Sequence, residues 1–419
     1  MCSKIRNKHN HAGDALAAER RLVRNDAHRI AAENPSLPTR RIIAQSTSAS
    51  SDALRTVGLS ENLARMIRHR RQVTRVEPPV PTDWRFEISE IFLTNNDGSP
   101  FVLFDSSTID DIRDGRIIIL GSRGTLDMLA MADRIAGDGS FSRSPPGFPQ
   151  FYTVHAQSGQ SFKPCVQFLM TQRTIPYYDY AFMKLKEIQP QFSPTSITMD
   201  YEQAVITSIQ SNFPGITIDG CFFHLANCCW RNVCTKGLKV PYSHNPDIAL
   251  HIRMLPCLAF LSPDQVSHGY TIISNIIHQK FDNQLDDFLD YFEDTFLGRP
   301  DGNGGRRAPR IPVSHWNLYM RVALDLPRTS NSLEAWHRAI KNSLPSEHPS
   351  IWRFFEVMKE ELVLSMNHAA EADRSASQRP KYVKISADLQ RYQQSFMSGT
   401  TGMLQFLTQC SNKIKFGGN

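Results

Sequence analysis

The 419-residue sequence lacks the features of membrane-spanning and secreted proteins. It has no run of about 18 consecutive apolar residues, so we expect no transmembrane segment. Its first residues are polar and basic, without the apolar core of a secretory signal. It has only eight cysteines, irregularly spaced, which argues against a disulfide scaffold and favours a reducing compartment. These absences leave a globular chain long enough for roughly two or three domains.

The overall composition is ordinary for a globular protein, with 41% hydrophobic and 21% charged residues. Acidic residues are nevertheless scarce near the N-terminus. Residues 1–80 contain 15 Lys and Arg against 7 Asp and Glu, a net charge of +8. The remaining residues contain 32 against 34, a net charge of −2. A basic arm of this kind could bind nucleic-acid phosphates, but it could equally be a solvated arm that aids solubility.

The N-terminal region has helical sequence patterns followed by a break. Residues 15–34 are rich in Ala, Arg and Glu, and residues 38–73 show apolar positions at steps of four. Four arginines gather between positions 65 and 71. The sequence Pro-Pro-Val-Pro at 78–81 indicates a linker.

From residue 81 the pattern changes to short apolar runs bounded by turn residues, which predicts strands, and then to alternating helices and strands. This order is typical of a mixed α/β sheet. We expect strands at 101–105, 116–120, 150–157, 166–171, 196–199 and 216–218, and helices at 125–134, 181–188, 203–213 and 221–233.

Beyond residue 238 the strand signal nearly vanishes. We expect helices at 248–261, 263–279, 285–297, 332–342 and 351–367. Beyond about residue 375 the sequence is polar, with one expected helix at 387–396. The aromatic residues of the helical part, including Trp230 and Trp316, could serve DNA or dimer contacts, but core packing explains most of them as well.

Two aspartates precede elements at which functional residues often lie. Asp138 stands before Gly139 and a block of strands, and its oxygens suit a hard cation such as Mg²⁺. An Asp-Gly turn is the commoner explanation. Asp200 follows a short strand and precedes a helix, where functional residues gather in α/β sheets. An ordinary helix N-cap would explain it too.

Glu334 lies on the helix expected at 332–342. The apolar stripe of that helix consists of Leu333, Trp336 and Ile340, and Glu334 lies on the other side with His337. An ordinary surface helix would show the same pattern.

Cys221 and His224 form a Cys-x-x-His pair that invites a zinc interpretation. A zinc site normally needs four ligands, and no second pair follows at a common spacing. Packing of a small buried thiol beside a hydrogen-bonded histidine is the alternative. Near the N-terminus, Cys2, His9 and His11 cannot by themselves close a tetrahedral site.

In combination, these pieces resemble the transposase domain of Mutator-like elements (MULE). The resemblance covers about residues 80–370 and rests on the order and spacing of short motifs, with 62 residues from Asp138 to Asp200 and 134 more to Glu334. The motifs are Asp-Gly-Ser-Phe at 138–141, Met-Asp-Tyr-Glu-Gln-Ala at 199–204, Phe-Pro at 213–214, Gly-Cys-Phe-Phe-His-Leu at 220–225, Trp-Asn-Leu-Tyr at 316–319 and Arg-Thr-Ser-Asn-Ser-Leu-Glu-Ala-Trp-His at 328–337.

The resemblance implies an α/β fold, an RNase H-like mixed sheet with an all-helical insertion, preceded here by the helical basic N-terminal region. It implies a DDE mechanism of DNA cleavage and strand transfer, in which Asp138, Asp200 and Glu334 hold Mg²⁺ or Mn²⁺. Cys221 and His224 match a Cys-x-x-His element of these transposases, whose role is structural or close to the site, with Zn²⁺ as one option. The implied partners are transposon ends and target DNA, with a homodimer as a further option, in the nucleus.

The resemblance also suggests how the chain is divided. Residues 1–14 resemble the end of a FLYWCH-type zinc finger whose upstream half is missing, so we expect a truncated finger. The full division is 1–14 finger remnant, 15–80 basic helical region and linker, 81–237 first part of the core, 238–330 helical insertion, 331–370 core helices with Glu334, and 371–419 polar tail. The alternative to an active or truncated transposase is a non-catalytic, transposase-derived DNA-binding or regulatory protein.

Overall fold

The fold is known from a computed structural model of the chain, which forms two compact units, Met1–Val80 and Pro81–Asn419. The structure describes residues 15–33, 39–47, 51, 63, 66–67, 78–95, 97–108, 114–140, 143–327, 331–344, 347–372, 380–414 and 416. The finger remnant predicted at 1–14 therefore lies outside the described residues.

The first unit contains two described helices, α1 (Ala15–Glu33) and α2 (Thr39–Ser46). Val23, Ala27 and Ile30 recur at helical spacing on α1 and are buried in a small core with Ile42 of α2. The helix predicted at 15–34 is present. The opposite side of α1 is polar and exposed, with Arg29 paired to neighbouring carboxylates.

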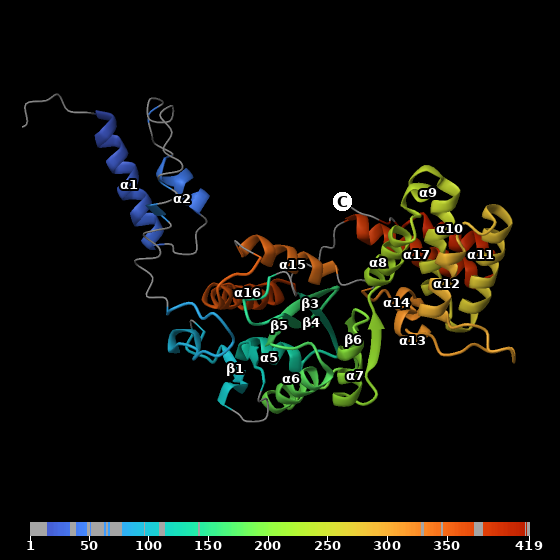
Figure 1. Ribbon diagram of the computed structural model, residues 1–419, viewed down its shortest axis with the longest axis horizontal. Helices are drawn as coiled ribbons and strands as arrows, with labels where there is room; N and C mark the ends of the chain where they lie inside the picture. The colour runs from blue at the N-terminus through green and yellow to red at the C-terminus, as the bar shows by residue number, and fades with distance from the viewer. Residues whose placement is uncertain are drawn as a thin grey trace, which may run out of the picture. The chain divides into compact units, whose positions relative to one another are not determined.

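The second unit is built on a seven-stranded mixed sheet of order β1-β2-β5-β4-β3-β6-β7 (Figure 1). Neighbouring strands from β1 to β3 pair antiparallel, whereas β3, β6 and β7 run parallel. The strands are β1 (Val102–Asp105), β2 (Ile117–Leu120), β3 (Arg134–Ser140), β4 (Gln150–Ser158), β5 (Ser161–Met170), β6 (Ser196–Met199) and β7 (Thr217–Gly220). The predicted mixed α/β class is confirmed.

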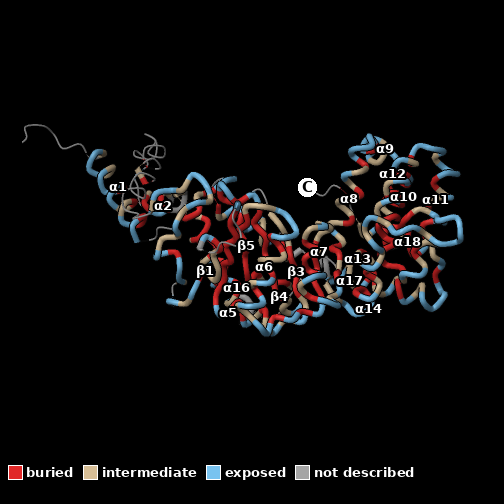
Figure 2. Tube along the Cα trace, turned by 60° about the horizontal axis from the view of Figure 1, so that its bottom comes forward, coloured by how far each residue is buried: buried red, intermediate tan, exposed pale blue. Residues whose placement is uncertain are grey.

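Helices cover both faces of this sheet, which explains why its strands are apolar at consecutive positions (Figure 2). On β2, Ile117 and Ile119 belong to one core, and Ile118 and Leu120 to the other. The first core is closed by α5 (Arg123–Ala130), α6 (Ile175–Ile188) and α7 (Gln203–Asn212), and the second by α15 (Asn331–Ser343) and α16 (Ile351–Ala372).

A helical region with a core of its own lies beside β7 (Figure 1). Its longer helices are α8 (Phe222–Thr235), α10 (Pro246–Cys257) and α11 (Val266–Phe281). Shorter ones are α9 (Lys239–His244), α12 (Asp286–Phe292), α13 (Val313–Trp316) and α14 (Tyr319–Ala323).

The C-terminal segment, predicted as a polar tail with a single helix, instead forms two helices that complete this core. They are α17 (Pro380–Met397) and α18 (Met403–Ser411). Leu389, Phe406 and Leu407 are buried against α10 and its neighbours. Polar residues surround these few apolar positions, which weakened the hydrophobic pattern in the sequence.

Large aromatic residues of the helical region pack internally. Trp316 is fully buried and donates a hydrogen bond from Nε1 to the carbonyl of Phe296 (2.9 Å). Trp230 packs against Tyr242 and Phe416. The core-packing alternative thus accounts for both tryptophans. In the described part of the chain, no helix combines the length and apolar character needed to cross a bilayer.

A buried ion pair attaches the segment before β1 to the edge of the sheet. Arg116 is fully buried and donates to both carboxylate oxygens of Asp105, from Nε (2.8 Å) and from Nη2 (2.5 Å). Its Nη1 donates to the carbonyls of Trp84 and Phe86. The guanidinium therefore has a partner for each of its three nitrogens.

We expect Asp105→Ala to lower the free energy of unfolding by about 3–5 kcal/mol, because it leaves the Arg116 charge buried and unpaired. Urea unfolding followed by tryptophan fluorescence measures the change. The control is Asp114→Ala, which removes an exposed carboxylate from the same region. Equal stability of the two variants would show that the ion pair contributes nothing.

Candidate active site

The pairing of β3 with β6 brings Asp138 and Asp200 together. The two strands run parallel, with Ile135 opposite Ile197 and Ala136 opposite Thr198. Two residues further along this register, Asp138 is level with Asp200. Because side chains alternate along a strand, both aspartates lie on the face of Ala136, which packs against Leu333 of α15. The Asp-Gly turn considered for Asp138 is not formed, since residues 135–140 pair with β4.

The glycines flanking Asp138 leave room for two side chains of β4. A Cβ at Gly137 would lie 2.0 Å from Tyr152 Oη, and one at Gly139 would lie 2.7 Å from Gln150 Nε2. Both neighbours are buried, so neither can move aside cheaply. The Gly-Asp-Gly sequence therefore lets Tyr152 pack flat beneath the strand that carries Asp138.

Asp200 is the first residue after β6, and its carboxylate orders the turn into α7. Its Oδ1 accepts a hydrogen bond from the N–H of Glu202 (3.1 Å), and Glu202 is itself the N-cap residue of α7. Burial and the charge of Asp138 raise the pKa of Asp200, against the opposing effects of His224 and Arg173. Burial and a neighbouring carboxylate thus make ionisation of Asp200 less favourable.

Glu202 is a third acidic residue near this pair. Its Oε1 accepts from Tyr178 Oη (3.1 Å), which in turn accepts from Gln150 Nε2 (2.7 Å). Arg173 Nη2 lies 3.8 Å from the same carboxylate. Burial and the charge of Asp200 raise the pKa of Glu202. The sequence feature that could have indicated that Glu202 lies close to Asp200 is their Asp-x-Glu spacing at the end of a strand.

Cys221 and His224 lie beside Asp200 because α8 begins close to the end of β6. Cys221 is buried, is the N-cap residue of α8, and donates its N–H to the carbonyl of Met199 (3.1 Å). Burial lowers the pKa of His224, but the hydrogen bond with Cys221 and the charges of Asp138 and Asp200 outweigh it and raise that pKa to about 9. The imidazole is therefore a positive neighbour of the two aspartates.

Helix α15 brings a second histidine to Asp138. Trp336 packs edge-on against His155 and donates from Nε1 to Glu361 of α16 (2.9 Å), which fixes the rotation of the helix. His337 Nε2 then lies 3.0 Å from Asp138 Oδ2, without the alignment of a hydrogen bond. The sequence placed His337 on the surface side of this helix, but its side chain is only 14% exposed because it faces the aspartate.

Glu334 belongs to the same helix, one turn before His337 and next to Leu333, which packs on Ala136. Its backbone is therefore on the part of α15 that covers the aspartates. The Glu334 side chain lies outside the described residues, so its predicted meeting with Asp138 and Asp200 remains a prediction.

Residues 136–228 match the family model of the MULE transposase domain. The matched segment contains Asp138, Asp200, Cys221 and His224, and it does not extend to Glu334 or to residues 1–14. No curated protein matches the chain. The match supports the predicted MULE-type transposase domain in this part of the chain, and with it a DNA-binding role in general terms.

The described side chains do not form a complete metal site. In that part of the chain, no three His, Cys, Asp or Glu side chains are grouped as a metal ion would require. This holds for the Cys221 and His224 pair, for which zinc was considered, and for Asp138 and Asp200. The two aspartates are thus a pair of neighbouring oxygen donors, without a third such side chain grouped with them among the described residues.

We expect Asp200→Asn to stabilise the metal-free protein at pH 7. Because the pKa of Asp200 is higher in the folded chain, its ionisation opposes folding above that raised pKa and has no effect below its usual value of 3.8. Asparagine keeps an oxygen to accept from Glu202 N–H. Thermal unfolding in EDTA should show a higher midpoint for the variant at pH 7, with the gain lost as the pH falls through this window.

The control for this measurement is Asp127→Asn, which changes an exposed carboxylate on α5. A gain for Asp200→Asn that persisted unchanged at pH 3 would contradict the explanation by ionisation.

Proposed function

We propose that this protein is a MULE-type DDE transposase, or a truncated or domesticated copy of one, that cleaves DNA and transfers the cut strand with the help of divalent metal ions. The observation that carries the proposal is the pair Asp138 and Asp200, side by side on adjacent parallel strands inside the MULE domain. Their partial burial and mutual repulsion make them a poor structural pair and a good cation site.

The proposed fold is RNase H-like. Support comes from five neighbouring strands, β5-β4-β3-β6-β7, in which an antiparallel meander is followed by two parallel strands linked through helices. The helical region between β7 and α15 corresponds to the insertion that such transposases place between the second aspartate and the glutamate.

In this proposal Asp138, Asp200 and Glu334 hold Mg²⁺ or Mn²⁺. The donor set fits, because carboxylate oxygens are the ligands these hard cations prefer. The pKa of Asp200 is raised by burial and, to a lesser extent, by the charge of Asp138, and a cation held by these carboxylates would offset both effects. When bound, such ions activate water or a 3′-hydroxyl and stabilise the leaving oxygen.

The surrounding residues hold the carboxylates in place. The N–H of Glu202 fixes the Asp200 side chain, and Tyr178 holds Glu202. His337 contacts Asp138 from α15, and His224 offsets negative charge from α8. With no third ligand beside them among the described side chains, we assign Cys221 and His224 a structural role at the α8 N-terminus rather than a zinc site.

The proposed substrates are transposon ends and target DNA, and the proposed compartment is the nucleus. The basic excess of residues 1–80 supports DNA binding, since a net charge of +8 favours phosphate contacts. The same excess is what favours the second candidate, a transposase-derived protein that binds DNA without cutting it. A homodimer belongs to the proposal as the form that would bring two element ends together.

We expect the parent protein to cleave terminal-inverted-repeat DNA with Mg²⁺ or Mn²⁺. Asp138→Ala, Asp200→Ala and Glu334→Ala should each reduce the rate at least about a hundredfold, the scale of losing one charge-stabilising group at a reaction centre. The rate of strand cleavage, read on denaturing gels, measures the effect. Asp127→Ala, an exposed carboxylate on α5, should cleave like the parent.

A second measurement separates binding of the ion from catalysis. Mn²⁺ should raise the thermal midpoint of the parent and of Asp127→Ala, but not that of Asp200→Ala, since a ligand stabilises the state that binds it. Cleavage at the parental rate by Asp200→Ala and Glu334→Ala would refute the metal-site assignment. A parent that binds DNA and never cuts it would favour the DNA-binding candidate.

A further inference from the structure

One side of α8 extends from the aspartates to an exposed arginine. His224, Cys228 and Arg231 are spaced by four and three residues, so they lie on the same side of the helix. The helix starts beside Asp200, since the N–H of Cys221 bonds to Met199. At a rise of about 1.5 Å per residue, Arg231 lies about 10 Å along the axis from His224.

A second arginine joins this side of α8 from a distant loop. Arg310 lies between η5 (Glu293–Leu297) and α13, and its backbone N–H bonds to the carbonyl of Asp294 (3.3 Å). Burial raises the pKa of the Cys228 thiol, as does the charge of Asp200, whereas Arg231 and Arg310 lower it. Both arginines act in the same way on Tyr291, whose pKa burial raises. The two guanidinium groups and Asp200 are therefore all close enough to Cys228 for their charges to act on its thiol.

Arg231 and Arg310 lie near Cys228, on the side of α8 that begins beside Asp200. Both arginines are exposed, and like Lys239 and Arg307 elsewhere in the helical region they have no carboxylate partner among the described residues. By contrast, Arg299 pairs with Asp290 and Asp294, and Lys236 with Asp287.

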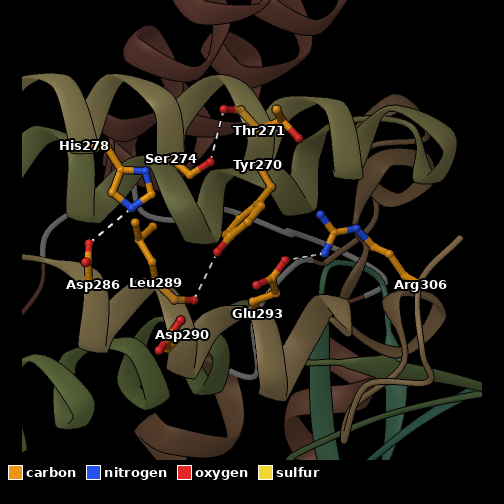
Figure 3. A pocket seen from close by; sticks show the side chains of 9 residues that line it. All are labelled: Tyr270, Thr271, Ser274, His278, Asp286, Leu289, Asp290, Glu293 and Arg306. Carbon is orange, nitrogen blue, oxygen red and sulfur yellow. Dashed lines mark hydrogen bonds and ion pairs between the residues drawn. The ribbon is translucent and has the colours of Figure 1, made fainter. Parts of the chain in front are cut away.

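In the hollow between α11 and α12, basic side chains lie next to carboxylates (Figure 3). There Arg306 points to Glu293 (2.6 Å), so this guanidinium has a carboxylate of its own, and His278 points to Asp286 (3.1 Å). Unpaired guanidinium groups beside a carboxylate site call for an anionic ligand supplied from outside.

We propose that Arg231 and Arg310 bind backbone phosphates of the DNA strand on one side of the scissile bond. The inference rests on the proposed function, because Asp138 and Asp200 define where that bond lies. A separation of about 10 Å corresponds to the rise of about three nucleotides along a DNA strand. Arg173, 3.8 Å from the carboxylate of Glu202, adds a further cation close to Asp200. The strand therefore runs from the sheet edge along α8 towards the helical region.

The test uses full-length protein and a fluorescent mixed-sequence DNA duplex without divalent metal, so that binding is measured apart from cleavage. Arg231→Gln and Arg310→Gln should each weaken binding about three- to tenfold and reduce the slope of log affinity against log salt by about 0.9, the effect of losing one phosphate contact. Lys239→Gln, which removes an exposed charge from α9 in the same region, should leave the slope unchanged.

The outcomes separate this inference from the proposed function. Parental salt slopes in both arginine variants would overturn the phosphate contacts, whether or not the parent cleaves DNA. A parent that cleaves DNA together with unchanged variants would leave the metal site standing and the strand path wrong. A parent that neither binds nor cleaves DNA would overturn both. In the cleavage assay, Arg231→Gln and Arg310→Gln should raise KM and leave kcat unchanged. The reason is that a phosphate contact is made in the bound substrate and in the transition state alike.

Discussion

The parallel pairing of β3 with β6 is the constraint on which the rest of the site depends. It sets Asp138 and Asp200 level with each other on one face of the sheet, although 62 residues separate them in the chain. A shift of this pairing by one residue would turn one carboxylate to the opposite face. The pairing is held by buried residues on both faces, so the position of the two charges is set by apolar packing that takes no part in chemistry.

Two helices from later in the chain then define what surrounds the aspartates. Helix α8 begins beside Asp200 and supplies His224, whereas α15 lies across the same face and brings His337 to Asp138. Each helix is anchored away from the carboxylates: α8 through Leu225 and Cys229 in the helical core, and α15 through Trp336 and its bond to Glu361. The positions of His224 and His337 at the site are therefore fixed by packing and hydrogen bonds that their helices make elsewhere.

Much of this arrangement could be predicted from the sequence, because local patterns carry it. The strand ending at Met199 and the helix that follows Glu202 appear where the alternation of apolar residues indicated them. Contacts between distant segments could not be predicted in the same way. His337 looked like a surface residue because helical spacing places it on the polar side of α15. The spacing cannot show that a carboxylate from another part of the chain packs against that polar side. The helix predicted at 387–396 is part of α17, whereas α18 and the contact of both helices with the core were not predicted, because that core is formed largely by residues far earlier in the chain.

The position of α17 and α18 in this core has a consequence for synthesis of the chain. A ribosome completes the sheet, with both aspartates in register, well before it makes the last helices. Until Phe406 and Leu407 are added, the helical core lacks two of its fully buried side chains. The core against which α8 packs, with Arg231 at its surface, is therefore complete only once α17 and α18 have been made.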